Sequence, residues 1–316
     1  AVNNVSFNVR RGEVFTLIGP NGAGKTTVFN LISRIYTPTT GTIAYAGPGG
    51  AMLPLTDQPP HKVAGLGIAR TFQNIELFEH ASVLHNLLIG RHTRQHSSLW
   101  AEMFFTRKVR DGEVQAREKA EQVIDFLDLQ HYRDTMVAGL PYGVRKVVEL
   151  ARALCTEPQL LLLDEPSSGL NVEETDDMAF WIQDIQHELG ITVLMVEHDM
   201  SLVSKVSDRV LAMNQGQVLA VGTPREVQSD PGVVEAARSM GASRMRVVRT
   251  VLIPEALSPL ILGYTFLFVG VIDMSAMAGL IGGGGNLVGG LGSLVGHRVS
   301  RVGGLVRGGV GGLVDG

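Results

Sequence analysis

One glycine-rich segment carries the residue types that bind a nucleoside triphosphate. Residues 19–27 read Gly-Pro-Asn-Gly-Ala-Gly-Lys-Thr-Thr, a match to the G-x-x-x-x-G-K-T phosphate-binding loop. Its glycines allow successive backbone N–H groups to converge on an anion. Lys25 can reach the β- and γ-phosphates, and the Thr26 hydroxyl can ligate Mg²⁺. A plain glycine turn that caps a helix is the alternative interpretation. The candidate phosphate-binding residues are Gly19, Pro20, Asn21, Gly22, Ala23, Gly24, Lys25, Thr26 and Thr27.

A carboxylate pair follows an apolar run later in the chain. Four leucines precede Asp164 and Glu165, and they predict a strand that is buried on both faces and ends where parallel sheets bind ligands. Asp164 is the candidate to hold Mg²⁺ through water, and Glu165 is the candidate to orient and deprotonate the attacking water. The same residues also predict an acidic turn that begins a helix, with Pro166 at its first position.

Two further polar residues complete the candidate catalytic set. Gln73 follows residues 68–72, where it can contact Mg²⁺ and the water, and His198 closes an apolar run, where it can donate to the γ-phosphate. Taken singly, Gln73 fits a polar loop residue and His198 a surface histidine. Their order and spacing relative to the loop and the carboxylate pair favour the catalytic interpretation.

The elements around these residues predict an α/β fold. Residues 13–18 are apolar and β-prone, and residues 26–33 have helical spacing, so the glycine loop joins a strand to a helix as its motif requires. Residues 79–140 read as helices, one of them over 114–129, and the basic run at 107–110 is most simply a solvated face. The apolar face predicted for that helix comprises Val123, Phe126 and Leu127.

In this order, the motifs resemble those of the ATPase subunits of ATP-binding cassette (ABC) transporters, over roughly residues 1–235. The resemblance implies a P-loop ATPase domain at 1–234 with a helical subdomain at about 79–145. Residues 69–78, 196–200 and 230–236 are similar to the ATPases of branched-chain amino acid importers. The matched motifs are Walker A at 19–27, the Q-loop at Gln73, the signature at 140–144, Walker B at 160–165, the D-loop at 168–171 and the switch histidine at His198.

The resemblance also implies partners and cofactors. In this family two ATPase subunits sandwich ATP and Mg²⁺ head to tail, so Tyr142 and Gly143 of the signature and Asn171 of the D-loop are implied nucleotide contacts. Transmembrane permease subunits, and indirectly a substrate-binding protein, are the implied partners at the cytoplasmic face of the plasma membrane. The expected function is ATP hydrolysis that energises uptake of branched-chain or related amino acids.

Two departures from the family pattern leave alternatives open. The usual signature is Leu-Ser-Gly-Gly-Gln, whereas Pro141 and Val144 here supply neither the serine hydroxyl nor the glutamine amide. A nucleotide-binding switch with little turnover is therefore a second hypothesis. The chain begins at Ala1, after the point where the family places an adenine-stacking aromatic residue, so a truncated N-terminus is expected. A soluble cassette for DNA repair or translation is a third hypothesis, but the coiled-coil insertion or tandem cassettes typical of that class do not occur in this sequence.

Composition agrees with a soluble, intracellular protein up to about residue 230. The 27 basic and 31 acidic residues nearly balance, so no nucleic-acid partner is indicated. Cys155, the only cysteine, excludes a disulfide within the chain and is expected to be a small core residue. No signal peptide is expected from the first residues of the sequence.

The character of the sequence changes from about residue 235. Residues 235–281 resemble the E-A-A loop of transporter permeases, followed by a part of a methionine-type importer permease. Within them, residues 256–272 form an uncharged apolar run at the short limit for a membrane span, preceded by basic residues. A hydrophobic core helix is the alternative interpretation.

The last part of the chain predicts no packed structure. Glycine takes 15 of the 35 positions in residues 282–316, and such a stretch cannot offset the entropy of ordering its backbone, so a disordered tail is expected. One helix and such a tail cannot form a translocation pathway. The hypothesis that follows is a chimeric reading frame spliced near residues 234–236, whose C-terminal part is non-functional.

Overall fold

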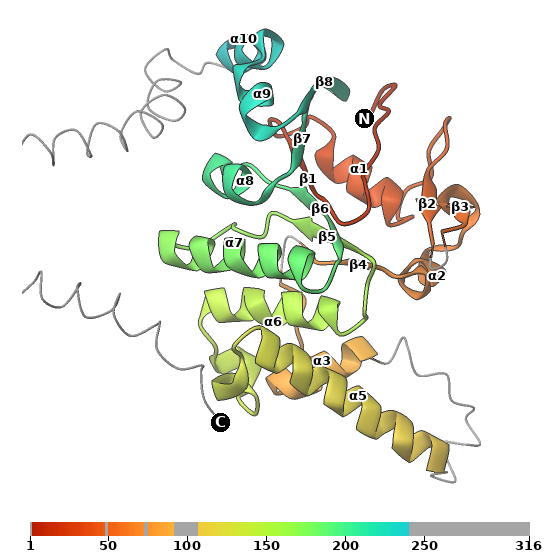
Figure 1. The fold of residues 1–316 in the computed structure, drawn as a ribbon, viewed down its shortest axis with the longest axis vertical. Coiled ribbons are helices and arrows are strands. Elements are labelled where there is room, and N and C mark those ends of the chain that lie inside the picture. The colour runs from red at the N-terminus through yellow and green to blue at the C-terminus, as the bar shows by residue number, and fades with distance from the viewer. Residues whose placement is uncertain (1, 48–49, 73–74, 92–106, 240–316) are drawn as a thin grey trace, which may run out of the picture. The chain divides into compact units, whose positions relative to one another are not determined.

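The computed structural model describes residues 2–47, 50–72, 75–91 and 107–239 (Figure 1). All of them belong to the first of two compact units, Ala1–Gly241. The second unit, Ala242–Gly316, lies outside the described residues, and so do the predicted apolar segment at 256–272 and the glycine-rich tail.

A six-stranded sheet in the order β4-β5-β6-β1-β7-β8 forms the centre of the first unit (Figure 1). Its first five strands are parallel, and β8 runs antiparallel to β7. The strands are β1 Val14–Ile18, β4 Ile68–Arg70, β5 Leu160–Asp164, β6 Thr192–Val196, β7 Arg209–Asn214 and β8 Gln217–Gly222. Because β1, β5 and β6 are short apolar runs buried on both faces, they take the central positions.

Alternate residues of these strands serve two different cores. On one face Phe15 and Leu162 pack with Phe29 of α1 (Lys25–Ile32). On the other face Leu161 and Met195 belong to a larger cluster that includes residues of α6 (Tyr142–Leu154) and α7 (Val172–His187). The strand period of two therefore divides one apolar run between two helical layers.

The helical region between β4 and β5 contains α3 (Val83–Arg91) and α5 (Arg107–Phe126). The helix predicted over 114–129 thus begins and ends earlier than expected. Asp128 has a left-handed φ of 53°, which is incompatible with continuing the helix, although Leu127 and Leu129 remain buried after it. Val123 and Phe126 pack against the core as predicted. The short 3₁₀ turns Gln130–Tyr132 and Val137–Gly139 lead to α6.

The prediction that Pro166 begins a helix is wrong. The chain after β5 forms a turn in which Glu165 and Gly169 have φ values of 51° and 80°, and α7 begins only at Val172. Asn171 supplies the start signal: its side chain accepts from Glu174 N–H while the Glu174 carboxylate accepts from Asn171 N–H, a reciprocal capping box.

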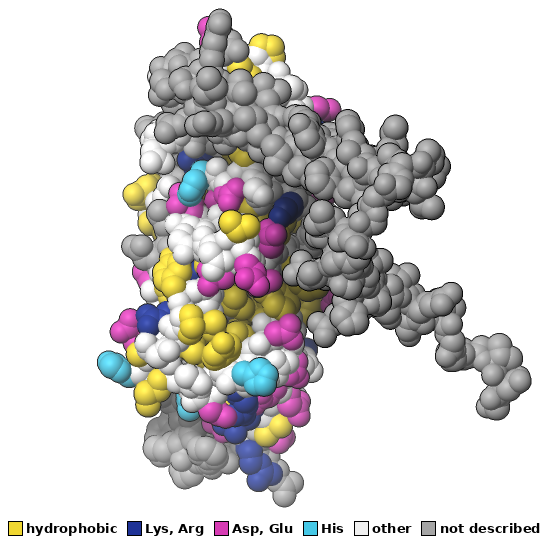
Figure 2. Space-filling model, turned by 90° about the vertical axis from the view of Figure 1, so that its left-hand side faces the viewer, with side chains coloured by type: hydrophobic (Ala, Val, Ile, Leu, Met, Phe, Trp, Pro, Cys, Tyr) yellow, Lys and Arg dark blue, Asp and Glu magenta, His cyan; other side chains and the backbone are white. Residues whose placement is uncertain are grey.

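The remaining elements lie at the margins of the sheet. A two-stranded sheet pairs β2 (Ala44–Ala46) with β3 (Met52–Pro54), and α2 (Pro60–Val63) precedes β4. After β6 come α8 (Met200–Val206), then α9 (Pro224–Ser229) and α10 (Pro231–Ser239). Figure 2 shows acidic side chains interspersed with hydrophobic ones on the described part of one face. Within the described ranges no helix is both long and apolar enough to span a membrane.

Candidate active site

The glycine loop connects β1 to α1 and takes a shape that its glycines require (Figure 1). Gly19 has a φ of 145°, and a Cβ at this position would lie 2.2 Å from the Met213 carbonyl oxygen. Gly24 precedes the first turn of α1 with a φ of 104°. Lys25 Nζ donates to the carbonyl oxygens of Gly19 at 2.7 Å and Pro20 at 3.1 Å. The loop is therefore closed around its own lysine.

The glycine loop has exposed residues beside a buried lysine, an arrangement that suits the binding of an anion from solvent. Asn21, Gly22 and Thr26 are exposed, whereas Ala23 and Lys25 are buried. Thr26 lies in the first turn of α1, whose N-terminal N–H groups have no partners within the helix and carry its positive dipole end. The loop therefore presents solvent-accessible backbone and hydroxyl groups next to the buried Lys25 ammonium.

Asp164 and Glu165 lie close enough to Lys25 to affect the pKa of its ammonium group. Burial lowers the pKa of the Lys25 ammonium, and the negative charges of Glu165 and Asp164 oppose that shift. Lys25 follows β1, whereas Asp164 ends β5 and Glu165 follows it; both strands are neighbours of β6. Since the carboxyl ends of parallel strands share one edge of the sheet, residues 140 positions apart in the chain meet there.

Asp164 is buried and paired with an arginine that the sequence did not indicate. Arg70 at the end of β4 places Nη2 2.9 Å from Asp164 Oδ2. Arg70 also donates to Asn30 Oδ1 at 2.8 Å and to Ser33 Oγ at 3.2 Å. These bonds tie the end of β5 to β4 and α1.

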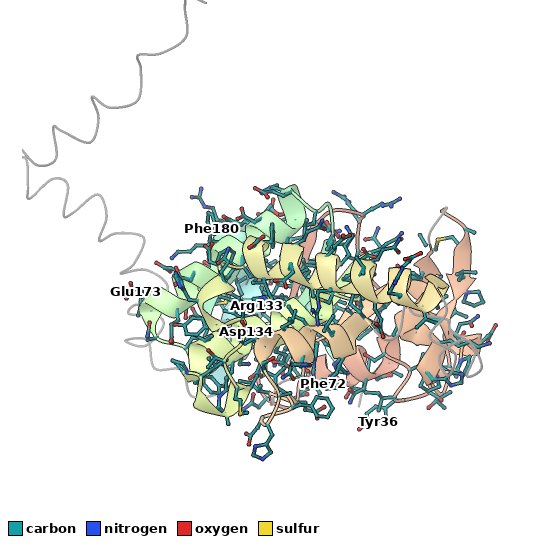
Figure 3. All side chains as sticks on the ribbon, turned by 90° about the horizontal axis from the view of Figure 1, so that it is seen from below. Tyr36, Phe72, Arg133, Asp134, Glu173 and Phe180 are labelled. Carbon is teal, nitrogen blue, oxygen red and sulfur yellow. The ribbon has the colours of Figure 1, made fainter. Side chains whose placement is uncertain are left out.

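Two aromatic rings flank the same guanidinium. The Arg70 Cζ atom lies 5.5 Å from the Phe29 ring centre and 5.3 Å from that of Phe72, distances at which a cation interacts favourably with an aromatic ring. Phe72 is partly exposed and is labelled in Figure 3, on the same side of the unit as Tyr36. Gln73, the next residue, lies outside the described ranges.

His198 follows β6 and approaches Glu165 from the neighbouring strand. Its Nδ1 lies 3.9 Å from Glu165 Oε1 and 3.5 Å from Glu197 Oε2. The His198 side chain is 63% exposed, whereas that of Glu165 is 19% exposed. The structure therefore brings Lys25, Asp164, Glu165 and His198 to one edge of the sheet, with the imidazole on its solvent side.

Glu197 is a second residue that the sequence did not indicate. Its side chain is fully buried and accepts from both the N–H and the hydroxyl of Ser167. It also accepts from the N–H groups of His198 at 2.7 Å and Asp199 at 3.4 Å. These hydrogen bonds join the His198 segment to the turn after Glu165.

The signature and D-loop candidates lie close to one another and to α7, and their contacts are those of close packing and helix capping. Gly143 is buried at the start of α6, and a Cβ there would lie 2.4 Å from Glu174 Oε1. A Cβ on Gly169 would lie 2.8 Å from the ring of Tyr142, which is 47% exposed. Asn171 caps α7. In the part of the chain that the structure describes, no hydrogen bond or ion pair joins Tyr142, Gly143 or Asn171 to the glycine loop.

Comparisons with known proteins agree with this arrangement. The family profile "ABC transporter" matches residues 2–168, and the profile "Binding-protein-dependent transport system inner membrane component" matches residues 227–301. The high-affinity branched-chain amino acid transport ATP-binding protein BraF of Pseudomonas aeruginosa is 40% identical over 236 residues, 75% of this chain and 91% of BraF.

Two further relatives extend the likeness. The high-affinity branched-chain amino acid transport ATP-binding protein LivG of Escherichia coli (strain K12) is 37% identical over 241 residues, again 75% of this chain and 91% of LivG. Among solved structures, MJ1267, an ATP-binding cassette of an ABC transporter in its ADP conformation, aligns with a TM-score of 0.64 and 32% identity. That alignment covers 75% of this chain and 92% of MJ1267.

Proposed function

The chain belongs to the ABC transporter family, and from this premise we propose that it is the ATP-hydrolysing subunit of an importer for branched-chain amino acids. The observation that carries the ATPase activity is the meeting of Lys25 with Asp164, Glu165 and His198 at one edge of the sheet. The identity to BraF and LivG supports the cargo class.

In this proposal each residue at the active-site edge of the sheet has one role. The N–H groups of residues 19–27 and the N-terminus of α1 bind the phosphates, and Lys25 turns from the loop carbonyls to the β- and γ-oxygens. Glu165 orients the attacking water and accepts its proton. His198 donates to the γ-phosphate, and its exposed position at the rim leaves it accessible to nucleotide.

Mg²⁺ is the proposed metal, and the oxygen donors at the site fit it. The exposed Thr26 hydroxyl and the buried Asp164 carboxylate are ligands of the type that Mg²⁺ prefers, with Gln73 as a third candidate. Among the described residues no group of three or more His, Cys, Asp or Glu could hold a metal ion. This agrees with an ion held largely by phosphate oxygens and water. When bound, it neutralises charge on the transferring phosphoryl group.

We further propose that two ATPase subunits pair head to tail on the cytoplasmic face of the membrane. Among the described residues no hydrogen bond or ion pair joins Tyr142, Gly143 or Asn171 to their own glycine loop, which agrees with nucleotide contacts across such a pair. Transmembrane permease subunits and a substrate-binding protein complete the importer. Pro141 at the N-cap of α6 offers no side-chain cap, so slow turnover remains the second candidate function.

Single-turnover ATP hydrolysis by the full chain distinguishes the two functions. We expect Glu165→Gln to slow hydrolysis by about 10²- to 10⁴-fold, the usual range for losing a general base, and Lys25→Ala to abolish ATP binding or turnover. Wild-type hydrolysis no faster than that of Glu165→Gln would favour the low-turnover switch. Retained activity in Lys25→Ala would refute the assignment of the loop.

The cargo class needs a separate experiment. The chain is co-purified with permease subunits, and its ATPase rate is measured with a binding protein and a panel of amino acids. We expect leucine, isoleucine or valine to stimulate hydrolysis, with charged amino acids as controls. Stimulation by another class of amino acid would overturn the cargo assignment while leaving the ATPase assignment intact.

A further inference from the structure

A buried lysine on α6 contacts the backbone of the proposed general base. Lys146 is 4% exposed and donates from Nζ to the Glu165 carbonyl oxygen at 3.3 Å. A buried ammonium is costly unless it is bonded and close to opposite charge. Its neighbours along the helix, Val144 and Val147, are partly buried apolar residues that pack against the larger core cluster. Lys146 is therefore a buried charge on a helix whose neighbouring residues pack against the apolar core.

The carbonyl that Lys146 contacts belongs to a residue with an unusual backbone. Glu165 has a φ of 51°, a left-handed conformation that residues other than glycine rarely adopt. Such a conformation persists only when its surroundings impose it. The Glu165 N–H donates to Val196 O at 2.9 Å, and its carbonyl accepts from Ser168 N–H at 3.1 Å as well as from Lys146. Three hydrogen bonds therefore hold the backbone of Glu165 in this conformation.

Four carboxylates lie close enough to the Lys146 ammonium for their charges to act on it. Those whose charge acts on it are, in decreasing order, Glu149, Glu197, Glu165 and Asp164. Glu149, one turn further along α6, is 3% exposed and accepts from Phe72 N–H at 3.1 Å. The buried face of α6 therefore bonds both to the turn after β5 and to the segment after β4.

We propose that Lys146 is a positioning residue for Glu165. By binding the Glu165 carbonyl, it holds the left-handed turn that directs the carboxylate toward His198 and the glycine loop. It acts through Glu165 and does not touch the nucleotide. A displacement of α6 would then move the general base without any change at the phosphate-binding loop. This inference rests on the proposed ATPase activity.

Lys146→Met tests the inference because methionine keeps the length and removes the donor. We expect kcat for ATP hydrolysis to fall by about 10- to 100-fold, the scale of a misplaced catalytic group, while KM for ATP changes less than about twofold. Lys146→Arg, which keeps the charge and a donor, should restore most of the rate. In a Glu165→Gln background, where the slow ATP hydrolysis is followed over hours, Lys146→Met should not lower kcat further.

Matched variants separate positioning from folding. Lys119→Met makes the same change at an exposed lysine of α5 and should leave kcat unchanged. If Lys146→Met unfolds because Glu149 keeps an unpaired charge, the double variant Lys146→Met/Glu149→Gln removes that charge, and the same fall in kcat is expected.

Three outcomes would overturn the inference: an unchanged kcat in Lys146→Met, an equal loss in the wild-type and Glu165→Gln backgrounds, or loss of ATP binding in both the single and the double variant. A wild-type chain that binds ATP without hydrolysing it would instead refute the proposed ATPase activity.

Discussion

Buried charged residues define the candidate site at the level of single side chains. Arg70, Lys146, Glu149 and Glu197 are each a tenth exposed or less, and each has a polar partner on another element. A charge in a helical or loop segment is most often solvated, so the sequence pattern gave no reason to select these four. Lys146 and Glu149 are spaced so that they share the buried face of α6, but that face is known only once its packing is known.

Cys155 gives a pH-dependent prediction at the same scale. Burial raises the pKa of its thiol to about 12 from an ordinary value of 9.0. Because the folded pKa lies above the unfolded one, the stability contribution is fully present below pH 9 and is lost as pH rises toward 12. At pH 10 we expect the free energy of unfolding to have fallen by about 1 kcal/mol through this group.

Chemical denaturation at pH 8 and pH 10 measures this effect. Cys155→Ala serves as the control, since lysines and tyrosines titrate in the same range in both proteins. An identical loss of stability in the wild type and in Cys155→Ala would contradict the prediction.

At the scale of elements, Asn171 has a structural role apart from any contact with nucleotide. Its side chain and that of Glu174 form the capping box that begins α7. We expect Asn171→Ala to lower the free energy of unfolding by about 1 kcal/mol, because a helix N–H loses its acceptor. Denaturant titration gives the value, and Asn171→Asp, which keeps the acceptor, should remain within a few tenths of wild type. Equal stability of the alanine variant would show that the cap contributes nothing.

At the scale of the whole molecule, the second family match begins inside the folded unit that contains the first. The permease profile begins at residue 227, yet Val227 is buried and Val233 of α10 packs against a cluster with Ile18 and Val210. The segment from 227 to 239 is thus part of the ATPase unit, whichever family its sequence resembles. The chimeric origin of the following residues remains our hypothesis, and long-read sequencing of the locus tests it. One uninterrupted natural gene would reject it.

The unit boundary gives a prediction for truncated chains. A chain that ends at Gly241, the last residue of the first unit, should keep the Tm and the ATPase rate of the full chain. A chain that ends at Gly222 removes α9 and α10, uncovers Ile18 and Val210, and should lose several degrees of Tm. Thermal unfolding and ATPase assays of the two truncated chains test these predictions. A Gly241 chain that fails to fold would contradict the assignment of the unit.

The sequence by itself predicted four of the residues at the proposed active site. Lys25, Glu165 and His198 each follow an apolar strand and Asp164 ends one. Because the carboxyl ends of parallel strands share an edge, local patterns were enough to predict that these residues lie together. The length of α5 and the start of α7 were predicted less well, since a left-handed residue and a capping box override helical periodicity.

Only the tertiary structure decided how those residues are held. The Arg70–Asp164 pair, the Lys146–Glu165 bond and the Ser167–Glu197 bonds join positions that are 94, 19 and 30 residues apart. Burial turns these charges from solvated side chains into fixed partners, because in the interior each must find a donor or an acceptor. Those contacts depend on how the helices pack against the sheet, which no local pattern of residues specifies.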